Sequence, residues 1–218
     1  MRIGNNYRGK EISKHRVNRK ADIKLDYVFD IFHDVAVEKV ESVKKDFLSK
    51  TLTFSGFCYL NYLNLSYEYE NRLWAFNYNL RYKTSVRDEN SIFGKEKCVF
   101  AVTNIGKTSI TDAEWRVVST TEEHRLDAEG FLLSLNNRMI IDRIVALDLT
   151  KTILEYSPRQ KTWEISCTSL IGSTTWILIP PVTQLIKPSL KECAQLYEFL
   201  EMVLHVVNSK STRQEGAL

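Results

Sequence analysis

Two neighbouring segments decide the fold: residues 51–69, TLTFSGFCYLNYLNLSYEY, and residues 73–83, LWAFNYNLRYK. Both are rich in Tyr, Phe, Leu and Thr, and their side chains alternate with the period of two that is typical of a β-strand. The polar break Glu70-Asn71-Arg72 separates them. The pair therefore predicts a β-hairpin.

One face of the second predicted strand is aromatic and the other is polar. The aromatic face is formed by Trp74, Phe76, Tyr78, Leu80 and Tyr82, and the polar face by Asn77, Asn79, Arg81 and Lys83. We expect the aromatic face to meet helices, with its rings packed as core. If the helices stand off the sheet, the rings instead line a mainly apolar cavity with a few hydroxyl contacts. The candidate ligand-binding residues are then Trp74, Tyr78 and Tyr82.

Further strands are expected along the rest of the chain. Single strands fit residues 97–104 and 113–120, a second hairpin fits 151–157 and 161–168, and a last strand fits 174–179. Pro180-Pro181 ends the last strand, because proline cannot donate to the ladder. Residues 122–148 suit a short helix or a buried strand equally well.

Two segments have the apolar spacing of long helices. Residues 22–49 repeat apolar side chains at steps of three and four, which predicts an amphipathic helix. Ser189 and Glu192 form a capping box, in which the serine caps free amides of the first turn and the glutamate reaches back. The helix that follows is so broadly apolar, from Leu190 to Val207, that it must be buried across the sheet.

The pattern as a whole predicts the α+β class. We expect a twisted antiparallel sheet of about six to eight strands, with a long N-terminal helix and a long C-terminal helix packed on it. The expected organisation is a basic flexible arm at residues 1–21, one domain at 22–208 and a frayed tail at 209–218.

Composition places the chain among ordinary globular proteins. Its 218 residues are 44% hydrophobic and 26% charged, with only 8 Gly and 4 Pro, which excludes disordered and collagen-like classes. The four cysteines are far apart and form no metal-binding spacing. No apolar run approaches the ~18 residues that a membrane span needs. We therefore expect a cytoplasmic protein that is not an integral membrane protein.

The positive charge is concentrated near the N-terminus. Residues 1–24 carry eight Lys or Arg and only two acids, whereas the whole chain has a net charge of +3. Such an arm can attract a polyanion, either nucleic-acid phosphates or lipid head groups. The candidate polyanion-binding residues are Lys14, Arg16, Arg19 and Lys20, and nucleic acid is one possible partner.

Catalytic motifs are absent from the sequence, which contains no G-x-G-x-x-G, H-E-x-x-H or G-x-S-x-G pattern. Residues 104–108, NIGKT, end like a phosphate-binding loop but lack its first glycine, so a strand-ending turn fits better. His124 lies among acids, as in an acid/base or metal site, although a solvated loop explains the same residues. We expect no cofactor.

Two further histidines lie on predicted helices, and each also has a structural interpretation. Asp30, His33 and Asp34 fall within one turn and offer ligands to a divalent metal, but charges are also expected on an exposed helix face. His205 follows Glu201 by four residues, which favours a structural pair. We therefore expect no metal site.

Three hypotheses about function follow. The leading one is a non-catalytic binding module for a partner protein or for an apolar small molecule held between sheet and helix. The second is a nucleic-acid-associated protein that uses the basic arm, and the third is a hydrolase or metal enzyme centred on His124.

Overall fold

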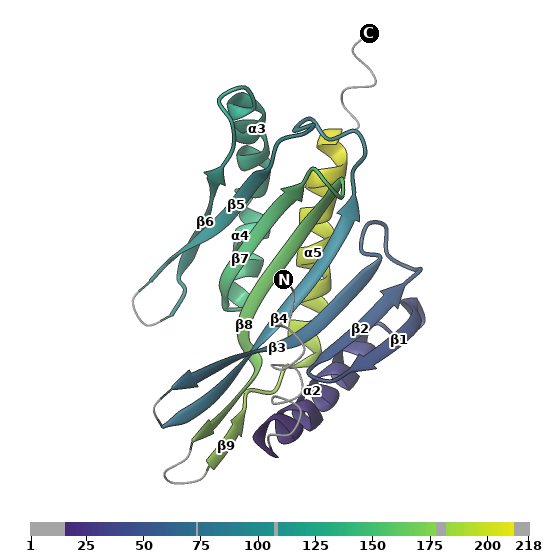
Figure 1. Cartoon of the computed structure of the whole chain (residues 1–218), viewed down its shortest axis with the longest axis vertical. Coiled ribbons are helices and arrows are strands. Elements are labelled where there is room, and N and C mark those ends of the chain that lie inside the picture. Colours follow the sequence, from purple (N-terminus) through teal and green to yellow (C-terminus); the bar gives the residue numbers. More distant parts are fainter. Residues whose placement is uncertain (1–15, 73, 107–108, 178–181, 212–218) are drawn as a thin grey trace, which may run out of the picture.

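The computed structural model describes residues 16–72, 74–106, 109–177 and 182–211. Figure 1 shows one antiparallel sheet with helices packed behind it. This confirms the predicted α+β class, including an N-terminal helix and a long C-terminal helix. The sheet has nine strands, more than the six to eight expected.

The strands lie in the order β1-β2-β3-β4-β8-β7-β5-β6, and β9 pairs with the end of β8. All of these pairings are antiparallel. The bounds are β1 Val40–Asp46, β2 Ser49–Phe54, β3 Tyr62–Arg72, β4 Ala75–Arg87, β5 Cys98–Ile105, β6 Asp112–Ser119, β7 Leu149–Ser157, β8 Thr162–Ile177 and β9 Val182–Leu185.

The helices form a second layer with α5, Leu190–Ser211, in the middle. Helix α5 contacts α2, Arg16–Val35, on one side, and it contacts α3, Arg125–Leu135, and α4, Arg138–Ala146, on the other. Helix α2 lies against β2, β3 and β8, while α3 and α4 contact β6. The ambiguous segment 122–148 therefore forms two helices, and the Asn137 side chain caps α4 by accepting from Met139 N at 2.9 Å.

The capping box at the start of α5 is confirmed. Ser189 N donates to Glu192 Oε2 at 2.7 Å, and Glu192 N donates to Ser189 Oγ at 3.2 Å. The helix then buries the apolar face that its sequence predicts. That face comprises Cys193, Leu196, Tyr197, Phe199, Leu200, Val203, Leu204 and Val207.

The N-terminal segment differs from its prediction. Helix α2 begins at Arg16, inside the expected arm, and ends at Val35 rather than Ser49. After a short 3-10 turn, η1 Val37–Lys39, the chain forms strand β1, which pairs with β2. The spacing of Val43 and Phe47 continues the helical pattern, but Val43 is exposed on the edge strand β1 and Phe47 is exposed in the turn that follows it. Pairing with β2 overrides the local periodicity here.

The first predicted hairpin is confirmed with changed boundaries. Residues 51–69 contain most of β2 and of β3, joined by a loop in which Phe54 N donates to Asn61 O at 2.8 Å. Residues 70–72 continue β3, so the predicted break lies within the strand, and Arg72 pairs with Ala75 at the end of the hairpin. The strands predicted at 161–168 and 174–179 both fall on one long strand, β8, which is described as far as Ile177, and residues 178–181 with the expected proline stop lie outside the described residues.

A wide bulge divides β8 into two parts. Leu80 of β4 pairs with Ser169 but Tyr78 pairs with Thr174, so residues 170–173 bulge opposite a single residue of β4. Ser173 Oγ accepts from Leu80 N at 2.8 Å and donates to Ser169 O at 2.6 Å, which satisfies backbone groups that the bulge frees. Beyond the bulge, β8 pairs with β9 and the start of β4.

Gly172 makes this bulge possible. Its φ of +83° is unfavourable for other residues, and a Cβ there would lie 2.3 Å from Leu80 Cδ2. Its carbonyl accepts from Tyr67 OH at 2.7 Å, and its N–H donates to Ile186 O at 2.6 Å. The bulge is therefore tied to β3 and to the segment after β9.

Both outer edges of the sheet are protected against addition of another strand. The edge strand β1 carries Lys44 and Lys45. At the other edge, strand β6, the Asn136 side chain hydrogen-bonds to both backbone groups of Trp115. It accepts from Trp115 N at 2.8 Å and donates to Trp115 O at 3.1 Å. These edges are poor templates for pairing with a second chain.

The replacement Leu200→Asp is expected to unfold the protein. Leu200 is buried in the face of α5 that meets the sheet, and a carboxylate without a partner there costs several kcal/mol of a typical ~5–15 kcal/mol stability. Thermal or urea unfolding checks this. The matched control is Glu198→Ala, which removes only the exposed ion pair with Arg143 and should change the stability by less than ~1 kcal/mol. Equal melting of the two variants would show that α5 is not docked.

Candidate binding groove

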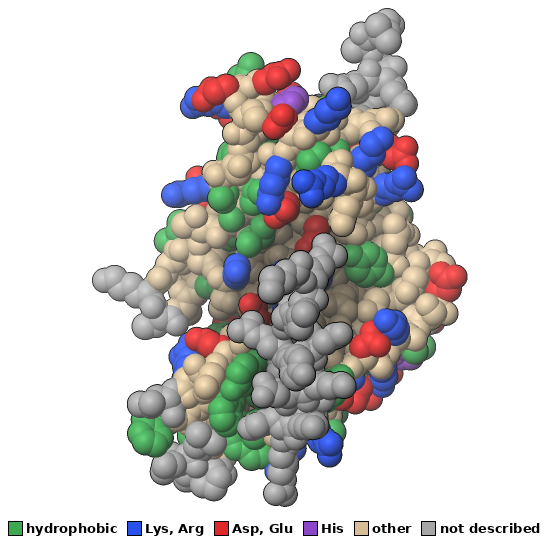
Figure 2. All heavy atoms as spheres, viewed as in Figure 1, with side chains coloured by type: hydrophobic (Ala, Val, Ile, Leu, Met, Phe, Trp, Pro, Cys, Tyr) green, Lys and Arg blue, Asp and Glu red, His purple; other side chains and the backbone are tan. Residues whose placement is uncertain are grey.

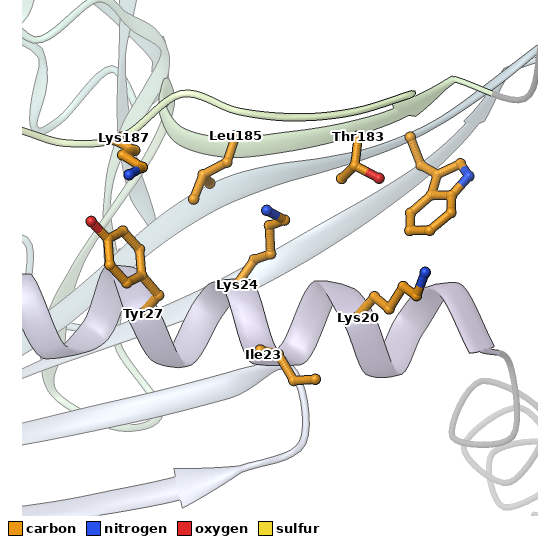
Figure 3. A pocket seen from close by; sticks show the side chains of 8 residues that line it. Lys20, Ile23, Lys24, Tyr27, Thr183, Leu185 and Lys187 are labelled. Carbon is orange, nitrogen blue, oxygen red and sulfur yellow. The ribbon is translucent and has the colours of Figure 1, made fainter. Parts of the chain in front are cut away.

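A groove of about 480 Å³ opens between α2 and the β8–β9 end of the sheet. We call it the α2–β9 groove. Figure 3 shows Lys24 and Tyr27 of α2 facing Leu185 and Lys187 across it. Its lining consists of Lys20, Ile23, Lys24, Tyr27, Trp176, Thr183, Leu185 and Lys187.

Local structure explains why these side chains converge. On α2 the lining residues follow the spacing i, i+3, i+4, i+7 from Lys20, which places them on one face of the helix. Thr183 and Leu185 of β9 share a face because strand side chains alternate, and Thr183 pairs with Trp176 of β8. The bulge in β8 positions this outer piece of sheet beside the first half of α2.

The two charged faces of α2 have opposite roles. Its acids point toward β1 and β2, where Asp22 and Asp26 lie 2.8 and 3.3 Å from the buried ammonium of Lys50. Asp30 binds Lys45 at 2.9 Å, and this contact raises the pKa of Lys45. Lys20 and Lys24 line the groove instead. The helix therefore separates its charges, with the acids neutralised and the lysines available.

The lysines of the groove are not neutralised by acids. Within the described part of the chain, no carboxylate forms an ion pair with Lys20, Lys24 or Lys187. Aromatic rings accompany two of them, since Lys20 Nζ lies 4.4 Å from the Trp176 ring centroid and Lys187 Nζ lies 5.2 Å from that of Tyr27. The groove thus combines apolar walls with uncompensated positive charge.

The groove has a closed floor. A recess of only about 10 Å³ reaches down to Tyr78, whose hydroxyl donates to Asn18 Oδ1 of α2. Burial raises the pKa of Tyr78 to about 12, so the hydroxyl stays neutral. A ligand in the groove meets a solid floor rather than an opening into the core.

The predicted aromatic site residues are not brought together. Tyr78 and Tyr82 are packed in the core, and Tyr82 OH donates to Ile171 O at 3.2 Å. Trp74, which we expected to face the helices, is 59% exposed, because it lies at the hairpin reversal beyond the end of α2. Only Tyr78 reaches the groove, as part of its floor. The rings of β4 therefore form core and not a cavity.

The predicted polyanion-binding residues are only partly described. Lys14 and the side chain of Arg16 lie outside the described residues, Arg19 is exposed, and Lys20 lines the groove. Sequence reasoning missed Lys24 and Lys187, which join Lys20 there. The four-residue spacing of Lys20 and Lys24 could have predicted that both lie on one face of the helix. Lys187 could not be predicted in this way, because it reaches the groove through the path of β9.

His33 and His124 each lie beside one carboxylate. No group of three potential metal ligands occurs in the part of the chain that the structure describes. His124 Nδ1 lies 3.3 Å from Asp127 Oδ2, and His33 Nδ1 lies 3.5 Å from Asp34 Oδ1. Neither histidine gains a third group that would make a site.

The expected Glu201–His205 pair does not form. Glu201 Oε1 instead accepts from Tyr59 N at 3.0 Å and from Leu60 N at 2.6 Å, and thus anchors the β2–β3 loop to α5. His205 Nδ1 lies 3.0 Å from Tyr59 OH. Both residues have a structural role, as expected, but each contacts the β2–β3 loop instead of the other residue.

Near residues 104–108 the chain makes a turn between β5 and β6. Thr111 N donates to Ile105 O at 2.8 Å and closes it, while residues 107–108 lie outside the described residues. The turn joins two antiparallel strands, whereas a phosphate-binding loop leads from a strand into a helix.

Residues 30–207 match the DUF3156 family, described as proteins of unknown function. The chain belongs to this family. No curated protein and no solved structure matches the chain. The family match covers the sheet, α3, α4 and most of α5, but only the end of α2 from residue 30. The β8–β9 side of the α2–β9 groove therefore lies within the match, and the α2 side lies before it.

The length and hydropathy of a helix decide whether it can span a membrane. Over residues 16–72, 74–106, 109–177 and 182–211, none of the helices is long and apolar enough to cross a bilayer.

The replacement Tyr78→Ala should lower the free energy of unfolding by roughly 3–5 kcal/mol, because it removes a buried ring beneath the groove. The matched change Tyr78→Phe keeps the ring and loses only the hydroxyl contact with Asn18, so a loss of about 1 kcal/mol is expected. Urea unfolding measures both. A small effect of Tyr78→Ala would mean that the ring lines open space.

One cysteine should react much faster than the other three. Cys58 is exposed, whereas burial raises the pKa of Cys98, Cys167 and Cys193 to about 12 and keeps these thiols protonated. Ellman's reagent should titrate one thiol in the native protein and four after unfolding. Cys58→Ser should abolish the fast phase. A second fast thiol would show that the helical layer opens.

Proposed function

We propose that the protein is a non-catalytic binding module that holds an elongated anionic amphiphile in the α2–β9 groove. The observation that carries this proposal is the set of three lysines that have no acidic partner among the described residues and that lie beside apolar and aromatic side chains in a groove between helix and sheet. The leading sequence hypothesis also placed an apolar ligand between helix and sheet, but on the aromatic face of β4.

Size and chemistry support this class of ligand. The groove volume of about 480 Å³ lies in the range of ~300–1,000 Å³ that small-molecule sites usually have. Ile23, Tyr27 and Leu185 offer contacts to an alkyl chain. Lysine ammonium groups suit a carboxylate or phosphate head, because each is a compact charge with three donors on a flexible stem.

The other hypotheses receive less support. The enzyme hypothesis rests on His124, which forms an ion pair with Asp127 on the same helical turn. The nucleic-acid hypothesis keeps Arg19 and Lys20 as candidates, and a steep salt dependence of RNA or DNA retention would favour it. A cytoplasmic location remains part of our proposal and is supported by four unpaired thiols.

Calorimetry with laurate and the neutral analogue dodecanol tests the proposal. The triple variant Lys20→Gln, Lys24→Gln, Lys187→Gln should bind laurate about tenfold more weakly, since exposed ion pairs contribute ~0.2–1 kcal/mol each and 1.4 kcal/mol is tenfold. Dodecanol affinity should change little.

Lys44→Gln is the matched control, because Lys44 is an exposed lysine of β1 that lies outside the groove. Its laurate affinity should equal that of the parent. Absence of saturable laurate binding by the parent, or an equal effect of Lys44→Gln, would contradict the proposal.

A further inference from the structure

Exposed apolar side chains gather at one end of the molecule. Figure 1 places the β3–β4 hairpin tip, β9 and the N-terminal end of α2 together at the lower end. The pairing of Phe76 with Trp176, and of Ile177 with Val182, makes the two tips neighbours. Figure 2 shows hydrophobic side chains in this region of the open sheet face. The exposed apolar residues of these elements are Ile23, Tyr27, Tyr69, Trp74 and Val182.

The charge of this end is positive where it borders the groove. Lys20, Lys24 and Lys187 are free of acidic partners within the described chain, and the acids of α2 are bound to Lys45 and Lys50. On β3, Glu68 and Glu70 alternate with Tyr69 and so point to the opposite face of the sheet. Glu70 is also paired with Arg72 at 3.2 Å.

We propose that this end of the protein docks on an anionic bilayer surface, so that the α2–β9 groove opens at the membrane. Trp and Tyr side chains favour the membrane interface because they combine an apolar ring with a polar group. Lysines beside them are attracted to anionic head groups. Trp74, which is 59% exposed and directly precedes β4 at the hairpin tip, is the expected anchor.

The composition favours a bilayer over a protein partner. The exposed side chains project from separate tips and from one helix turn, where a fluid interface can receive each of them independently. Lysine side chains lie beside aromatic rings at this end. Its charge is therefore complementary to an anionic head-group layer. Docking needs no ligand in the groove, so this inference goes beyond the proposed function.

Co-sedimentation of the full chain with vesicles tests the docking. Vesicles of phosphatidylcholine with about 30 mol% phosphatidylserine should retain the protein, and vesicles of phosphatidylcholine alone should not. Retention should fall as salt rises, because head-group attraction is screened beyond ~10 Å at 0.1 M salt. Equal retention by both vesicle types would overturn the proposal.

Two variants separate the docking surface from the groove. The double change Trp74→Ser, Val182→Ser should weaken vesicle binding about tenfold and leave laurate affinity unchanged, since neither residue lines the groove. Trp74→Tyr should retain most of the binding. The matched control is Leu133→Ser, which alters an 81% exposed residue of α3 at the other end of the molecule and should have no effect.

The outcomes distinguish the two proposals. Laurate binding without vesicle retention leaves the groove function and overturns the docking. Vesicle retention that depends on Trp74, without laurate binding, supports the docking and contradicts the groove function. If Trp74→Ser, Val182→Ser lowers retention on single-stranded RNA rather than on vesicles, the surface binds nucleic acid and the docking proposal is overturned.

Discussion

The bulge of β8 at residues 170–173 is the constraint on which the rest of the structure depends. Strand β8 pairs with β4 on one side and with both β7 and β9 on the other, so any change in its path moves the whole sheet. Gly172 adopts a backbone conformation that other residues disfavour, and Ser169 and Ser173 satisfy the polar groups that the bulge exposes. The inner part of the sheet can therefore close over α5, while the outer part runs beside α2 and forms a groove.

The separation of acidic and basic side chains on α2 gives the groove its positive charge. The buried Lys50 and the neighbouring Lys45 hold the acids of α2 against β1 and β2, which fixes the rotation of the helix about its axis. Burying an ammonium is unfavourable unless carboxylates surround it, so a different rotation would leave Lys50 without compensation. The same rotation turns Lys20 and Lys24 toward β9. A structural ion cluster thereby determines the chemistry of the opposite helix face.

Close packing explains why the candidate site is peripheral. Around Trp163 the core is filled by stacked and tilted rings, with Phe93, Phe100, Phe131 and Tyr156 at centroid distances of 5.3–6.1 Å from it. A second group, Phe32, Phe54, Phe57, Tyr82 and Tyr197, fills the space between α2, α5 and the sheet. Interiors of this kind leave no room for a ligand. The α2–β9 groove lies outside these clusters, where the sheet and α2 diverge.

The sequence by itself determined the fold class, most strands, the buried helix α5 and its capping box, because these depend on local periodicity and on contacts within one turn. It also pointed to Lys20 near the start of α2. Only the tertiary structure decided that residues 40–46 form a strand, since their partner β2 supplies the hydrogen bonds that override a helical spacing. It likewise decided that Trp74 is exposed and that Lys187 joins Lys20 and Lys24. Those outcomes depend on the bulge of β8 and on contacts between residues more than one hundred positions apart, which no local pattern encodes.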